Sequence, residues 1–163
     1  MLSSSPLLGW AREAGLKSLE MTVGHYSFVT ETFLGLRHGP MSFVKSDALV
    51  LCLLSSEPVR RFYEMDLIAE LRAKKKIGFL VGIADPQETK GIFDEIIPAI
   101  APHENDALRT PYEIVGPQLL GYHLSLNLGL NPHNPSPDGI INRVVQGFGI
   151  HHVPPYEELS TTR

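Results

Sequence analysis

The chain has 163 residues, of which 43% are hydrophobic and 20% charged, and its formal net charge at pH 7 is −4. This length suits one domain with a sizeable core, and the composition is ordinary for a globular protein. The acidic balance and the lack of a basic stripe argue against binding to nucleic acid, and no apolar run reaches the roughly 18 residues of a membrane-spanning helix.

The first predicted element is a helix over Pro6–Val23, with Ser5 as its N-cap and Pro6 at its first helical position. Successive residues of an α-helix are rotated by about 100° around the helix axis. The side expected to face the core therefore carries Leu8, Ala11, Gly15, Leu16, Leu19 and Val23.

The chain starts unusually close to this helix. Only Met1 and Leu2 precede Ser3, which is too short for the strand that normally feeds a first helix. We expect that most of this strand is absent. The chain is then either a fragment or is completed by a partner chain.

Apolar runs of strand length alternate with helical segments along the rest of the chain. The runs Ala48–Leu54, Ile77–Ala84 and Glu95–Ile100 are expected strands, and Tyr26–Thr30 is a candidate for a fourth. Helices are predicted over Ser56–Lys75 and Pro111–Leu128. This alternation predicts an α/β fold, with a mainly parallel sheet between helices on both faces.

Two prolines mark details of the later helices. Pro58 lies in the first turn of Ser56–Lys75, whose side facing the sheet is expected to carry Val59, Phe62, Tyr63 and Leu67. Pro117 should kink the helix over Pro111–Leu128 or end its first segment.

Cys52 is the single cysteine, so no internal disulfide forms and nothing indicates an oxidising compartment. It lies in an apolar run and is expected to be a buried thiol, since a nucleophile needs a basic partner and exposure. The amino terminus lacks the pattern of a signal peptide. We therefore expect a cytoplasmic protein.

The first helix carries the sharpest candidate chemistry. Glu13, Lys17 and Glu20 share one side at spacings i, i+4 and i+7. Spacing alone favours a solvated face with an ion pair. The functional alternative is a pocket in which one carboxylate moves a proton between neighbouring sugar carbons, while the lysine stabilises the enediolate.

Other polar candidates are weaker on their own. His38, in the sequence Gly35–Pro40, lies at an expected turn and can titrate near neutral pH, although it can equally serve as a turn hydrogen-bonder. Ser3, Ser4 and Ser5 lie before a helix, where either anion binding or capping explains them. His151 and His152 lack companions at metal-ligand spacing, so no metal is expected.

Glu13–Glu20 (EAGLKSLE) followed by Leu36–Pro40 (LRHGP) resembles the SIS (sugar isomerase) domain family. Gly35–Ser42, Leu67–Arg72 and Asn142–Gly147 are similar to the carboxy-terminal SIS repeat of AgaS-type tagatose-6-phosphate ketose/aldose isomerases and galactosamine-6-phosphate deaminases. The resemblance covers roughly residues 1–151 and implies a three-layer, flavodoxin-like αβα sandwich over them. Residues 152–163 would then be a tail.

The resemblance also implies roles for single residues. Glu20 matches the glutamate that moves the proton between C1 and C2, and Glu13 and Lys17 match its supporting neighbours. His38 matches a histidine associated with ring opening. In the isomerase half of glutamine–fructose-6-phosphate amidotransferase, to which these motifs are also similar, this histidine reaches the neighbouring subunit's site. A homo-oligomer, or pairing with an amino-terminal SIS half, is therefore implied.

Further residues are expected to contact substrate: Ser3, Ser4, Ser5, Arg37 and Arg143. Arg143 stands where the amidotransferase has a catalytic lysine, and arginine cannot form a Schiff base. The function implied is isomerisation of a hexose or hexosamine 6-phosphate through an enediol, with or without deamination and without any cofactor. The alternative is a non-catalytic phosphosugar-binding or interface module.

Overall fold

A parallel four-stranded sheet forms the centre of the computed structural model, which describes residues 1–74, 77–87, 89–139, 147 and 149. The strands lie in the order β1 (Leu2–Ser3), β2 (Leu49–Leu53), β3 (Phe79–Ala84) and β4 (Glu95–Pro98). The three apolar runs predicted as strands are confirmed. Arg143 and the predicted tail over residues 152–163 lie outside the described residues.

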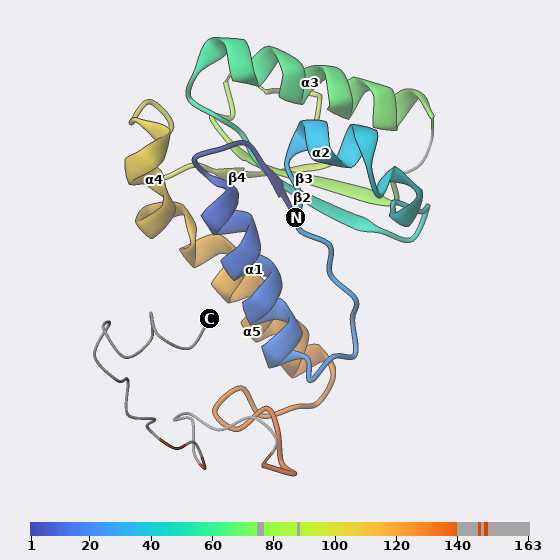
Figure 1. The fold of residues 1–163 in the computed structure, drawn as a ribbon, viewed down its shortest axis with the longest axis vertical. Helices are drawn as coiled ribbons and strands as arrows, with labels where there is room; N and C mark the ends of the chain where they lie inside the picture. Colours follow the sequence, from blue (N-terminus) through green and yellow to red (C-terminus); the bar gives the residue numbers. More distant parts are fainter. Residues whose placement is uncertain (75–76, 88, 140–146, 148, 150–163) are drawn as a thin grey trace, which may run out of the picture.

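Helices cover both faces of this sheet, as predicted (Figure 1). On one face α1 (Leu8–Met21) packs along α5 (Val115–Asn127), and α4 (Asp106–Glu113) precedes α5. On the other face α2 (Phe33–His38) packs against α3 (Pro58–Ala73), and a 3-10 turn over Met41–Phe43 follows α2. The predicted three-layer α/β architecture is therefore confirmed.

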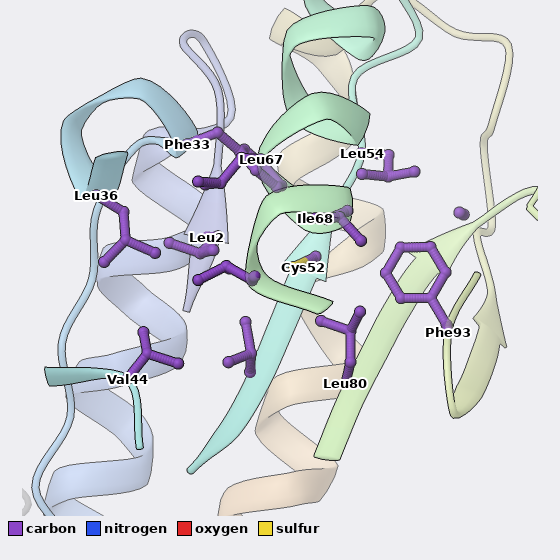
Figure 2. Close-up of a cluster of buried hydrophobic side chains, with 13 residues drawn as sticks. Leu2, Phe33, Leu36, Val44, Cys52, Leu54, Leu67, Ile68, Leu80 and Phe93 are labelled. Atoms are coloured by element: carbon purple, nitrogen blue, oxygen red, sulfur yellow. The ribbon is translucent and has the colours of Figure 1, made fainter. Parts of the chain in front are cut away.

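Each face of the sheet has its own apolar core, because side chains alternate along a strand. Toward α2 and α3, Cys52 of β2 lies among Leu67, Ile68 and Leu80 (Figure 2). Toward α1 and α5, Leu51 and Leu53 of β2 join the second cluster, which includes Trp10. Burial raises the pKa of the Cys52 thiol to about 12, in agreement with the expected buried thiol.

The predicted inner side of the first helix was partly wrong. Ala11 and Gly15 are buried as expected, but Leu16 and Leu19 are 47% and 43% exposed. Besides Trp10, the helix buries the small residues Ala11, Ala14, Gly15 and Ser18. A Cβ at Gly15 would lie 2.4 Å from the Thr30 methyl carbon, so the segment that follows α1 packs closely against this side of the helix. This packing, and not the positions of the leucines, decides which side is buried.

The ends of α1 also differ from the prediction. The helix starts at Leu8, its N-cap is Leu7 without a side-chain hydrogen bond, and the Ser5–Pro6 peptide bond is cis. The predictions that Ser5 is the N-cap and that Pro6 is the first helical residue are therefore both wrong.

The other predicted helices need similar corrections. In α3, the side chains of Val59, Phe62 and Tyr63 are exposed, whereas Leu67 is buried as predicted. The helix predicted over Pro111–Leu128 is two helices, which break at Ile114. This break lies three residues before Pro117, close to where the proline was expected to act.

The segment over residues 26–31 is extended and lies beside β1, but it does not form a strand of the sheet. Its pairing is an isolated parallel bridge between Glu31 and Leu2, and the Glu31 amide donates to the Met1 carbonyl at 3.1 Å. The candidate strand over Tyr26–Thr30 is therefore not formed as predicted, while β1 itself has only two residues.

Candidate functional site

A half-exposed polar stripe runs along α1. The Lys17 Nζ atom lies 2.9 Å from a Glu20 carboxylate oxygen and 3.9 Å from one of Glu13. The three side chains are 39%, 35% and 38% exposed. The hydrogen bond that Lys17 donates to Glu20 is the main cause that raises the pKa of Lys17, so the lysine carries its charge between two carboxylates.

This stripe contributes little to stability. Ion pairs at such spacings on an accessible helix are worth about 0.2–0.5 kcal/mol each. The arrangement can nevertheless perform chemistry, since an ordered carboxylate within reach of solvent can accept and return a proton. The structure thus brings together Glu13, Lys17 and Glu20, as the sequence predicted.

His38 lies away from this stripe within one chain. It is the last residue of α2, where the sequence predicted a turn, and its side chain is exposed. Because α2 packs on α3 and α1 packs on α5, the two helices lie on opposite faces of the sheet (Figure 1). A site that combines Glu20 with this imidazole therefore requires His38 from another chain.

Arg37 has a partner inside the chain. Its Nε atom donates to a Glu70 carboxylate oxygen at 3.0 Å, which links α2 to α3. Lys74 pairs with the same carboxylate, and this contact is the largest cause that lowers the pKa of Glu70. Arg37 therefore pairs with Glu70 of α3 and does not lie at the stripe on α1.

The three serines before α1 differ in exposure. Ser3 is fully buried and its hydroxyl donates to the Leu7 carbonyl at 2.9 Å. Ser4 is partly buried, and its hydroxyl contributes a hydrogen bond that lowers the pKa of Glu64. Ser5 is exposed. The structure does not place all three hydroxyls around one anion.

A buried ionic network closes the carboxyl end of β2. The Asp106 carboxylate accepts hydrogen bonds from the Ser55 hydroxyl, from the Ser56 amide at 2.8 Å and from Arg109 Nη1 at 3.0 Å. Arg109 is 1% exposed and also donates to the Leu54 carbonyl at 2.8 Å. Burial raises the pKa of Asp106, but the hydrogen bonds outweigh burial and hold this pKa below its ordinary value.

Glu64 of α3 lies beside this network and is fully buried. One carboxylate oxygen accepts from the Ser55 amide at 2.9 Å, whereas Oε1 makes no close, well-aligned hydrogen bond within the described part of the chain. Burial raises the pKa of Glu64 and outweighs the hydrogen bonds from Ser4 and Ser55. A buried carboxyl group of this kind is expensive to ionise.

The sequence reasoning missed Glu64, Asp106 and Arg109. Asp106 and Arg109 are three residues apart on α4, and Glu113 follows four residues later, within 3.5 Å of Arg109. The i, i+3 and i+7 pattern of charges was the available signal. It was overlooked because the predicted helix began at Pro111.

A cavity of about 590 Å³ lies at the opposite end of β2. Its walls include Met1, Phe28, Val44 and Val50, and neither the stripe on α1 nor His38 lines it. Within the described residues, no group of three or more His, Cys, Asp and Glu side chains could hold a metal ion.

Comparisons with known proteins identify the relationship. No family model matches the chain. The chain is 36% identical over 151 residues to the Escherichia coli D-galactosamine-6-phosphate deaminase AgaS, which covers 92% of this chain and 39% of that protein. Over 92% of its length the chain is related to proteins named AgaS, and its structural neighbours have the SIS fold.

Solved structures agree with this SIS assignment. The E. coli tagatose-6-phosphate ketose/aldose isomerase superimposes with a TM-score of 0.74, at 33% identity over 80% of this chain and 36% of that one. A Clostridium novyi protein superimposes with a TM-score of 0.83 at 30% identity, over 93% of this chain and 40% of that one. The chain spans about two fifths of the AgaS proteins it matches. In the part of the chain that the structure describes, no helix is long and apolar enough to cross a membrane.

Proposed function

We propose that this chain forms part of a cytoplasmic sugar-phosphate aldose–ketose isomerase of the tagatose-6-phosphate and galactosamine-6-phosphate type. The observation that carries the proposal is the ordered Glu13–Lys17–Glu20 stripe on α1. It is supported by the similarity to proteins named as the corresponding deaminase and isomerase.

In the proposed reaction, the Glu20 carboxylate takes the proton from one carbon of the open-chain sugar and returns it to the neighbouring carbon. An enediol forms between these steps, and no redox cofactor is needed because the hydrogen moves as a proton. Lys17 holds Glu20 by the 2.9 Å contact and its positive charge stabilises the enediolate oxygen. With an amino sugar, the ketimine formed reacts with water, which gives the ketose and releases ammonia.

The proposed site is shared between chains. His38 lies on the other face of the sheet, so a neighbouring chain would have to supply the imidazole for ring opening. The exposed Leu16 and Leu19 lie beside the stripe on α1, and Leu119 and Tyr122 are exposed on α5. An apolar surface of this kind favours contact with another chain, either a second copy or an amino-terminal SIS half.

The test is Glu20→Gln, with activity measured as interconversion of tagatose 6-phosphate or as ammonia release from galactosamine 6-phosphate. Since a positioned base typically contributes 10²–10⁴-fold, we expect kcat to fall by about 100-fold or more. Arg12→Gln, an exposed change on the same helix, is the matched control. Circular dichroism should be unchanged in both variants, and normal turnover by Glu20→Gln would refute the role.

A second candidate function is a non-catalytic SIS module that binds a phosphosugar or completes a partner's interface. The exposed apolar side chains of α1 and α5 favour it, since they suit an interface whether or not chemistry occurs beside them. A pure binding module has no chemical use for Glu20. Failure of the wild-type chain to bind any hexose phosphate would favour the interface function over both catalysis and sensing.

A further inference from the structure

A glycine lies buried in the middle of α1, where alanine would favour the helix more. A Cβ at Gly15 would lie 2.4 Å from the methyl carbon of Thr30 and 3.9 Å from the Cβ of Phe28. Carbon atoms in contact pack at about 3.5–4.0 Å. The backbone of α1 therefore lies closer to the segment over residues 26–31 than any residue with a side chain at this position would allow.

The position of Thr30 is fixed by the bonds between its segment and β1. The Met1 nitrogen donates to the Val29 carbonyl at 2.8 Å, and the Glu31 amide donates to the Met1 carbonyl at 3.1 Å. These two bonds hold the peptide groups on both sides of Thr30. The threonine side chain is also β-branched and therefore stiff at χ1. The contact between Thr30 and Gly15 thus sets the distance between α1 and the sheet.

The polar stripe lies on the opposite side of α1 from this contact. At about 100° per residue, Glu13, Lys17 and Glu20 are about 140–160° from Gly15 around the helix axis. A movement of α1 away from Thr30 would therefore carry the whole stripe outward. The Lys17–Glu20 contact lies within the helix, so it would be kept while its position relative to the sheet changed.

Two other glycines have more space around them. A Cβ at Gly121 of α5 would lie 3.5 Å from the Lys17 carbonyl oxygen and 3.6 Å from the Met21 Cγ atom, which are ordinary contact distances. A Cβ at Gly9 of α1 would enter open space within the described part of the chain. A methyl group at each of the three glycines therefore meets a graded resistance, from overlap at Gly15 to none at Gly9.

We propose that Gly15 is a positioning residue, which through its contact with Thr30 sets where Glu20 meets the substrate. The inference rests on the function proposed above, in which His38 comes from another chain, so that the gap between Glu20 and this imidazole depends on the placement of α1. Gly15→Ala has to move α1 by about 1 Å to reach an ordinary contact with Thr30. A misplacement of this size can cost about 100-fold in rate.

The test measures kcat and KM with the assays of the Glu20→Gln experiment, for Gly15→Ala and for the matched changes Gly121→Ala and Gly9→Ala. We expect kcat of Gly15→Ala, expressed per folded molecule, to fall by about 10- to 100-fold, with KM nearly unchanged. Gly121→Ala and Gly9→Ala should keep kcat close to the wild-type value. Circular dichroism and urea unfolding give the folded fraction of each variant.

Two changes at Thr30 identify the contact. Thr30→Ser removes the methyl group and keeps the hydroxyl group, whereas Thr30→Val keeps the methyl group and removes the hydroxyl group. Combined with Gly15→Ala, Thr30→Ser should restore most of kcat and Thr30→Val should not. Any other pattern would mean that the loss does not arise at this contact, and the proposal would be wrong.

Combination with Glu20→Gln separates positioning from stability. If Gly15 acts through Glu20, then Gly15→Ala should lower kcat of Glu20→Gln no further. The proposal is overturned by a second, independent loss in that background, by unchanged kcat in folded Gly15→Ala, or by failure of Gly15→Ala to fold, which would assign Gly15 to stability alone. Normal turnover by Glu20→Gln would instead refute the proposed function, so the two failures are distinguishable.

Discussion

Asp106→Ala tests the buried network at the carboxyl end of β2. The substitution removes a carboxylate that is 3% exposed and that binds Ser55, Ser56 and Arg109. Breaking a buried ion pair by removing one partner typically costs about 3–5 kcal/mol. Arg109 would keep the Leu54 carbonyl at 2.8 Å, so we expect a loss near the lower end, at about 3 kcal/mol.

The measurement is urea unfolding at pH 7, with Asp66→Ala, an exposed change on α3, as the control. A surface substitution of that kind should change the free energy of unfolding by less than about 0.5 kcal/mol. A loss of stability in Asp106→Ala no larger than in this control would refute the reasoning, because it would mean that the network contributes nothing.

The pH dependence gives a second readout on the same residue. The folded-state pKa of Asp106 is lowered, so its stabilising contribution is complete above the unfolded value of about 3.9 and is lost as pH falls through the folded value. The difference between wild type and Asp106→Asn should therefore shrink at pH 3. A difference that is the same at pH 3 and pH 7 would assign the effect to packing.

Two further predictions concern other parts of the molecule. Burial raises the pKa of Glu64, so the folded state binds the carboxyl proton more tightly than the unfolded state does, and wild-type stability should fall as pH rises above about 4.3. Glu64→Gln should flatten this dependence of stability on pH, measured by urea unfolding between pH 4.5 and 8. An unchanged pH dependence in the variant would contradict the assignment. Leu119, 54% exposed on α5, is expected to lie in a contact between chains; Leu119→Asp should shift the mass in analytical ultracentrifugation toward the monomer, and Gln118→Asp, an exposed change on the same helix, should not.

The strands were predictable because a parallel strand buried on both faces has a continuous apolar sequence. Ala48–Leu54 extends one residue beyond β2 at each end, and Ile77–Ala84 starts two residues before β3 and ends with it. The helix faces were harder to predict. Phe62 and Leu16 are apolar but exposed, since which side of a helix is buried depends on what packs against it, and the sequence of that helix alone does not contain this information.

In the candidate site, too, local contacts could be predicted from the sequence and long-range contacts could not. The Lys17–Glu20 contact is local, so helical spacing was sufficient to predict it. The bond between Ser55 and Asp106 joins residues 51 positions apart, and no local pattern specifies such a pair. The separation of His38 from Glu20 was likewise invisible, because it depends on which face of the sheet each helix covers.

Alkylation of the single cysteine can report on how tightly α2 and α3 pack against the sheet. Cys52 is fully buried, and its pKa of about 12 leaves almost no thiolate at neutral pH. An alkylating reagent can therefore reach the Cys52 thiol only during moments when the layer of α2 and α3 separates from the sheet. Each labelled thiol records one such opening, so the rate of Cys52 alkylation measures how often this layer opens, without any engineered probe.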